Sequence, residues 1–178
     1  LYRDNNFSIE ELYDEYLDQI EIIMERSSGY NWGTYFERMV RQNDPETGDV
    51  FNPLQNTIEK LNRSNSPDGQ TYKACYEINV PELSSEVALY NGGSDRRRTR
   101  GLPCLSHLSF KLFDEAIHLT ALYRSHDYRF KVPGNLLGLA RLQNCVAREV
   151  DADVGQLVIH SSKASVATGP PKNEFRTI

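Results

Sequence analysis

The sequence is poor in cysteine and has no long apolar run. Its three cysteines, Cys75, Cys104 and Cys145, are widely spaced and include no C-x-x-C pair. This pattern indicates neither a disulfide framework nor a zinc site, and it fits a reducing cytoplasm. No apolar stretch approaches the roughly 18 residues that a membrane-spanning helix needs. We therefore expect a soluble, cytoplasmic protein without a bound metal or a membrane partner.

An excess of basic charge is also missing. Twenty-five acidic residues against 20 lysines and arginines give a net charge of -5, which argues against a nucleic-acid partner held by phosphate neutralisation alone. One basic run, which holds Arg96, Arg97, Arg98 and Arg100, is the exception. Such a loop could contact nucleic acid, but four arginines on a flexible loop are more often a solvated patch. A small molecule or a protein is the expected partner.

No signal peptide is visible in the given sequence. The sequence begins at Leu1 rather than Met and has no basic and apolar leader. This beginning leaves open that the sequence is a piece of a longer chain. Its 178 residues, 39% of them hydrophobic, are enough for one globular domain over residues 1–178 with a sizeable core.

Hydrophobic periodicity predicts a mixture of helices and strands. Apolar residues recur every three or four positions in two amphipathic helices, and they alternate with polar residues in the strands. A third helix is apolar around most of its circumference, so we expect it to be buried on nearly all sides. The sequence thus predicts an α+β (α/β-type) fold in which a mixed sheet has flanking helices and one buried central helix. The expected helices are 8–26, 53–61 and 134–150, and the expected strands are 72–80, 107–113, 116–124 and 156–160.

Cys104 stands at a marked position in the chain. It follows Leu102-Pro103 at the end of the basic loop, directly before a predicted strand. A lone cysteine is more often a buried and inert thiol than a reactive one. Cationic neighbours favour the reactive thiolate, however, and arginines lie nearby in the sequence. Both interpretations of Cys104 stay open at this point.

A second polar cluster follows the strand at 116–124. Arg124 beside Ser125 could bind one phosphate, and Asn135 offers the donor and acceptor pair that matches the polar edge of a pyrimidine. An equally acceptable interpretation is structural, with an ion pair between Arg124 and Asp127 and with Asn135 as a helix N-cap.

Three motifs in this part of the chain resemble those of a known family. The runs Leu102-Pro103-Cys104, Leu122-Tyr123-Arg124-Ser125-His126-Asp127 and Val132-Pro133-Gly134-Asn135-Leu136 are similar to the motifs of thymidylate synthase and of its relatives, the pyrimidine-nucleotide hydroxymethylases. The resemblance implies a single thymidylate synthase-like domain over residues 1–178. This domain could be incomplete at both ends, because the family's E-L-L-W-F-L-like helix with its catalytic Glu and the family's C-terminal third have no match in the sequence.

The resemblance also implies roles for five residues. Cys104 would be the nucleophile that adds to C6 of a pyrimidine, so that C5 can attack a one-carbon donor, normally methylenetetrahydrofolate. Arg124 and Ser125 would bind the nucleotide phosphate, and Asp127 would lie toward the folate pterin. Asn135 would read the base edge, where asparagine suits uracil. The family further implies a homodimer and a methyl- or hydroxymethyltransferase of nucleotide biosynthesis.

Departures from the family pattern favour a protein that has lost the activity. Gly69-Gln70-Thr71 stands where the family has S-R-R, whose arginines reach the partner subunit's phosphate, and residues 162–167 lack the family's sugar-binding His and Tyr. Arg96, Arg97 and Arg98 could compensate at the phosphate. The alternative is a non-catalytic nucleotide-binding or assembly protein that keeps the fold and part of the pocket.

Overall fold

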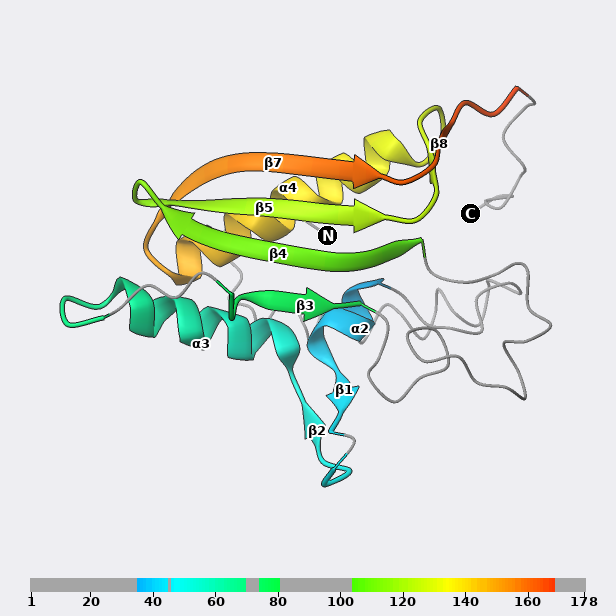
Figure 1. Ribbon diagram of the computed structural model, residues 1–178. Coiled ribbons are helices and arrows are strands. Elements are labelled where there is room, and N and C mark those ends of the chain that lie inside the picture. The colour runs from blue at the N-terminus through cyan, green and yellow to red at the C-terminus, as the bar shows by residue number, and fades with distance from the viewer. Residues whose placement is uncertain (1–34, 45, 70–73, 81–103, 169–178) are drawn as a thin grey trace, which may run out of the picture.

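The sheet and the helices on one of its faces are the main features of the computed structural model, which describes residues 35–44, 46–69, 74–80 and 104–168 (Figure 1). Four strands form the sheet in the order β3-β4-β5-β7. Neighbours are antiparallel except β5 and β7, which are parallel. The sheet is therefore mixed, as predicted. The strands are β3 (Glu77–Asn79), β4 (Leu105–Phe113), β5 (Ala116–Tyr123) and β7 (Asp153–Ser161).

The β4–β5 hairpin is closed by a two-residue turn. Asp114 and Glu115 have φ angles of 51° and 58°, the left-handed backbone that matches the twist of such hairpins. Phe113 therefore pairs directly with Ala116. Both strands agree within two residues with those predicted at 107–113 and 116–124.

Helix α3 (Pro53–Asn65) begins where proline predicts a first helical turn. The Asn52 side chain caps the helix by accepting a hydrogen bond from the backbone N–H of Gln55 at 3.0 Å. Leu54, Ile58 and Leu61 lie on its buried face, and each contributes about 1.5–3 kcal/mol to stability by leaving water.

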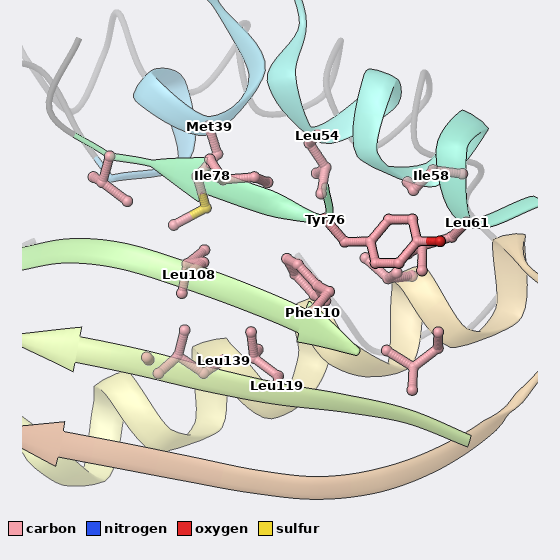
Figure 2. Packing of buried hydrophobic residues seen from close by; sticks show 14 of the residues in the cluster. Met39, Leu54, Ile58, Leu61, Tyr76, Ile78, Leu108, Phe110, Leu119 and Leu139 are labelled. Carbon is pink, nitrogen blue, oxygen red and sulfur yellow. The ribbon is translucent and has the colours of Figure 1, made fainter. Parts of the chain in front are cut away.

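The core lies between the helices and one face of the sheet. Figure 2 shows Leu54, Ile58 and Leu61 packed with Tyr76 and with apolar side chains of the sheet. Helix α2 (Tyr35–Val40) adds Met39 to the same cluster. The helix predicted at 8–26 lies outside the described residues.

Helix α4 (Val132–Glu149) crosses from β5 to β7 behind the sheet (Figure 1). The prediction that it is buried on nearly all sides is wrong. Only one face of the helix is buried, through residues such as Leu139 and Gln143, whereas Leu136 and Leu137 are 41% and 55% exposed. The reason is that α4 packs on β5 and β7 as an outer layer, so an apolar sequence on its other side does not produce burial.

Two short strand pairs complete the described part of the chain. Strands β1 (Gln42–Asn43) and β2 (Val50–Phe51) flank the turn that the sequence predicts at 43–49. Strands β6 (His126–Asp127) and β8 (Ala164–Ser165) pair in parallel. Periodicity missed all four because two residues hold no repeat.

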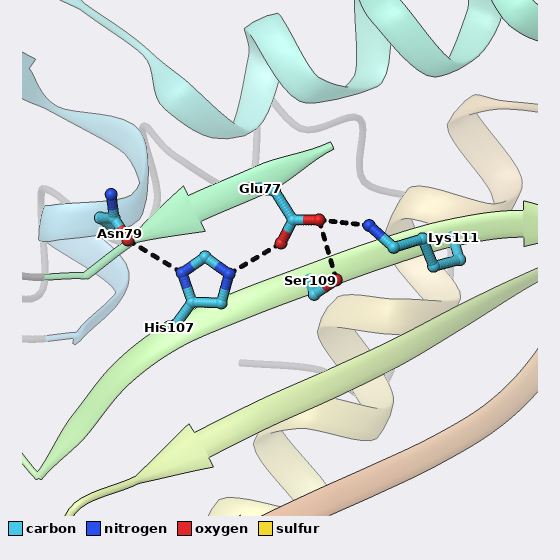
Figure 3. Close-up of polar contacts among 5 residues, drawn as sticks. All are labelled: Glu77, Asn79, His107, Ser109 and Lys111. Atoms are coloured by element: carbon cyan, nitrogen blue, oxygen red, sulfur yellow. Dashed lines mark hydrogen bonds and ion pairs between the residues drawn. The ribbon is translucent and has the colours of Figure 1, made fainter. Parts of the chain in front are cut away.

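The opposite face of the sheet carries a polar cluster on β3 and β4, shown in Figure 3. The Glu77 carboxylate contacts His107 at 2.7 Å, Ser109 at 3.0 Å and the Lys111 ammonium. His107 also contacts Asn79 at 2.8 Å. Partial burial opposes the charge of Glu77, but the three hydrogen bonds outweigh it and lower the pKa of the carboxyl.

Candidate functional site

Cys104 and Arg124 are brought together at one end of the sheet. The backbone N–H of Arg124 donates a hydrogen bond to the carbonyl oxygen of Cys104 at 2.8 Å, because Leu105 and Tyr123 are paired at the adjoining ends of β4 and β5. Cys104 is half-buried, whereas Arg124 and Ser125 are exposed. The backbones of Cys104 and Arg124 thus lie side by side at this end of the sheet.

Two tyrosines surround this cysteine. The backbone N–H of Cys104 donates to the Tyr35 hydroxyl at 3.2 Å, and the Tyr35 and Tyr123 rings meet edge to face with centroids 6.4 Å apart. Burial, assisted by the nearby Cys104 thiol, raises the pKa of both phenols. Both tyrosines are therefore neutral near pH 7 and can act as hydrogen-bond donors beside the sulfur. Neither tyrosine was predicted to be a site residue.

Asn135 joins the site through His126. The Asn135 amide nitrogen is 2.8 Å from Nε2 of His126, and Nδ1 of the same ring is 3.2 Å from the Ser161 hydroxyl. The imidazole stacks on Tyr123, with ring centroids 4.0 Å apart and an interplanar angle of 7°. Tyr123 and His126 thereby connect the surroundings of Cys104 to Asn135.

His126 is a functional candidate that sequence reasoning missed. Its side chain is 2% exposed, and this burial lowers its pKa although the neighbouring Asp127 carboxylate opposes the shift. The available signal was its place in the run Arg124-Ser125-His126-Asp127, where the flanking residues were assigned roles and the histidine was not.

The structure also settles the N-cap interpretation of Asn135. Helix α4 starts at Val132 and its N-cap is Lys131, so the interpretation of Asn135 as an N-cap is wrong. The residue lies within the first turn of the helix, with its side chain turned to His126 rather than to the backbone N–H groups at the helix end.

Asp127 organises the turn that leads into α4. One carboxylate oxygen, Oδ1, accepts backbone N–H groups from Arg129 at 2.9 Å, Phe130 at 3.4 Å and Ala167 at 3.5 Å. These bonds outweigh desolvation and lower the pKa of the carboxyl. Asp127 is therefore fixed and ionised beside His126.

Three other predictions concern the arginine run, a metal site and a membrane-spanning helix. Arg96, Arg97 and Arg98 lie outside the described residues. Within residues 35–44, 46–69, 74–80 and 104–168, no group of three or more His, Cys, Asp and Glu side chains is placed to hold a metal ion. Among the helices of the same ranges, none has the length and apolarity to cross a membrane.

Comparison with known proteins shows which proteins the chain resembles. No family model matches the sequence. A protein of Methanosarcina mazei named "Putative thymidylate synthase" is 31% identical over 157 residues, which cover 88% of this chain, and its Methanosarcina acetivorans counterpart is 29% identical over the same length. The chain spans 62% of the length of these two relatives.

The structural comparison gives the same fold. Thermostable thymidylate synthase A from Bacillus subtilis matches with a TM-score of 0.53 and 16% identity, over 86% of this chain and 50% of that one. The sequence therefore resembles proteins of the thymidylate synthase-like superfamily, as its motifs predicted, and the predicted fold class is confirmed.

Proposed function

We propose that this chain forms the nucleotide site of an enzyme that transfers a one-carbon unit to C5 of a pyrimidine nucleotide, with uracil as the favoured base. The observation that carries the proposal is the series of contacts that links three residues of different chemistry near the end of β5. Cys104, Arg124 and Asn135 are linked there by one backbone hydrogen bond and by the stacked rings of Tyr123 and His126. A nucleophile, a cation and an amide in that arrangement match the reactive carbon, the phosphate and the base edge of one ligand.

In the proposed reaction, the Cys104 thiolate forms a bond to C6 of the pyrimidine, and the C5–C6 electron pair moves to C5. Methylenetetrahydrofolate, when bound, supplies the electrophilic carbon that C5 attacks. C5 then loses its proton while the bond between the transferred carbon and the folate nitrogen breaks, with its electrons going to nitrogen. A hydride from the folate, or water, would add to the transferred carbon as the sulfur leaves C6 with its bonding electrons, which regenerates the thiolate. The neutral phenols of Tyr35 and Tyr123 exclude water from one side of the sulfur.

Ligand binding falls to exposed groups around the thiol. Arg124 and Ser125, both exposed at the end of β5, give the phosphate one charge-assisted and one neutral hydrogen bond. We propose that Arg96, Arg97 or Arg98 joins them and replaces the family's arginine pair.

Asp127 fits the folate donor by its chemistry. Its Oδ1 is occupied by three backbone N–H groups, so Oδ2 is the oxygen that an N–H donor of a pterin can reach. Folate and the pyrimidine nucleotide are thus the proposed small-molecule partners.

A homodimer is the proposed assembly. The sheet face opposite the core exposes Phe113 and Val158 at 51% and 48%, and Phe113 follows the polar cluster along β4. An apolar area flanked by satisfied polar groups is typical of an interface between copies.

The second candidate function is a non-catalytic nucleotide-binding or assembly protein. The observation in its favour concerns residues 162–167, which replace the family's sugar-binding pair. Ala164 and Ser165 of this segment form β8 and pair with β6, so the segment serves as a strand and its side chains offer no His or Tyr to a ribose.

Exchange of the C5 hydrogen of deoxyuridine monophosphate with deuterated solvent separates the two functions. Reversible addition of Cys104 to C6 makes C5 basic, so proton NMR should show loss of the C5 signal with the wild type and with Cys145→Ser, but not with Cys104→Ser. Binding without exchange would support the non-catalytic protein. Equal exchange by Cys104→Ser would contradict the proposed nucleophile.

A further inference from the structure

We infer that His126 determines which pyrimidine edge Asn135 can read, and that protonation of the imidazole reverses this choice from a uracil-type to a cytosine-type edge. The inference rests on the proposed function, in which Asn135 faces the base. It adds to that function a positioning residue and a pH-dependent specificity.

The first step is the direction of the hydrogen bond between the two side chains. An amide nitrogen can only donate, so Nε2 of His126, 2.8 Å from the Asn135 nitrogen, must be the acceptor. The ring proton is then on Nδ1, where it can be donated to the Ser161 hydroxyl at 3.2 Å. The arrangement therefore requires the neutral Nδ1–H tautomer of His126.

The Asn135 amide keeps two hydrogen-bonding groups for a ligand. With one N–H given to His126, Asn135 keeps its second N–H and its Oδ1 for a ligand. Uracil offers a matching pair, because its N3–H donates and its O4 accepts. Cytosine has the reverse order, with an accepting N3 and a donating N4 amino group. A fixed Asn135 amide thus distinguishes the two bases.

The third step is protonation. An imidazolium carries a proton on both nitrogens, so Nε2–H would then face the N–H groups of Asn135. Rotation of the amide by half a turn removes this conflict by placing Oδ1 against Nε2–H. The same rotation exchanges the positions of donor and acceptor toward the ligand, and it produces the edge that matches cytosine.

The groups packed around His126 set the pH range of this change. Asp127 on β6 favours the imidazolium, and burial against Tyr123 of β5 disfavours it. The Tyr128 ring, at 5.7 Å between centroids, and the Ser161 hydroxyl of β7 complete the contacts. Burial dominates and lowers the pKa of His126 from the ordinary 6.5. The amide is therefore held in its uracil-type orientation at neutral pH and released on the acidic side.

Calorimetric titration of deoxyuridine and deoxycytidine monophosphates between about pH 5 and 8 tests the inference, since this is the range in which histidines change charge. The preference for the uracil nucleotide should fall by about tenfold or more as the pH decreases, which corresponds to one reversed hydrogen-bond pair. His126→Gln keeps an accepting oxygen that does not titrate, so its preference should stay at the neutral-pH level throughout. His126→Phe keeps an aromatic ring but removes the acceptor, and it should lose the preference even at pH 8.

His160→Gln is the matched control, because His160 is exposed on β7 and should leave the wild-type profile unchanged. Nitrogen NMR of the ligand-free protein provides a second readout, in which His126 should be the Nδ1–H tautomer. A wild type that binds neither nucleotide would contradict the proposed function and the inference with it. Binding with a preference that is independent of pH, an Nε2–H tautomer, or an unchanged preference in His126→Phe would overturn the inference alone.

Discussion

Single residues in this protein act through neighbours that are far away in the sequence. Cys104 is the clearest example, because its surroundings come from Tyr35 on α2 and Tyr123 on β5. The sequence motifs selected Cys104, Arg124 and Asn135, which are linked through one backbone hydrogen bond and through the rings of Tyr123 and His126. Tyr35 and His126 could not be selected in the same way, since their importance lies in a hydrogen bond and a ring stack that only the folded chain creates.

At this scale, Glu77 should make stability depend on pH. Its folded pKa is lowered from 4.5 by hydrogen bonds from Lys111, His107 and Ser109, so its stabilising effect is present above pH 4.5 and is lost as the pH falls through the folded pKa. Glu77→Gln should reduce the free energy of unfolding at pH 7 by about 1 kcal/mol or more. The difference from the wild type should disappear at the lowest pH.

Urea unfolding at pH 7 and at pH values below 4.5 measures the free energy of unfolding of each variant. Glu59→Gln is the control, since Glu59 has only exposed contacts, an ion pair with Arg63 at 3.8 Å and a hydrogen bond from Gln55 at 3.5 Å, and the change should alter stability by less than about 1 kcal/mol. An equal loss in both variants at pH 7 would show that the cluster of Figure 3 adds nothing specific.

Helices and strands were predictable where a repeat was long enough to count. The apolar spacing in α3 and the alternation in β4 and β5 gave boundaries within a few residues of the observed ones. Helix α4 shows that hydrophobic periodicity does not by itself predict burial. Its apolar circumference was read as full burial, but burial depends on what covers each face, and the face with Leu136 and Leu137 is exposed in this chain.

The β4–β5 turn gives a prediction at the scale of elements. Asp114 and Glu115 both adopt positive φ, which costs a residue with a side chain about 1–2 kcal/mol. Glu115→Gly should therefore stabilise the protein by about 1 kcal/mol, because glycine adopts this backbone freely. The measurement is the free energy of unfolding in urea.

A glycine in a regular helix is the appropriate comparison. Glu59→Gly on α3 should destabilise the protein by about 1 kcal/mol. If Glu115→Gly were as destabilising as Glu59→Gly, the positive φ angles of the turn would carry no strain.

For the molecule as a whole, the open face of the sheet predicts association. A homodimer that covers Phe113 and Val158 should sediment at twice the monomer mass at micromolar concentration. Val158→Lys should convert it to a monomer, because an unpaired ammonium would be buried in the interface. Val50→Lys is the matched control, since Val50 is 58% exposed on β2 away from the sheet. A monomeric wild type would contradict the proposed assembly.

The central claim is that Cys104 is the nucleophile of a nucleotide site built at the end of β5. Its most direct test is mass spectrometry of the protein after incubation with 5-fluorodeoxyuridine monophosphate and methylenetetrahydrofolate. Fluorine at C5 cannot leave as a proton does, so the covalent intermediate should accumulate. We predict one adduct on Cys104, with Cys75 and Cys145 unmodified. An unmodified Cys104, or equal modification of all three cysteines, would contradict the account.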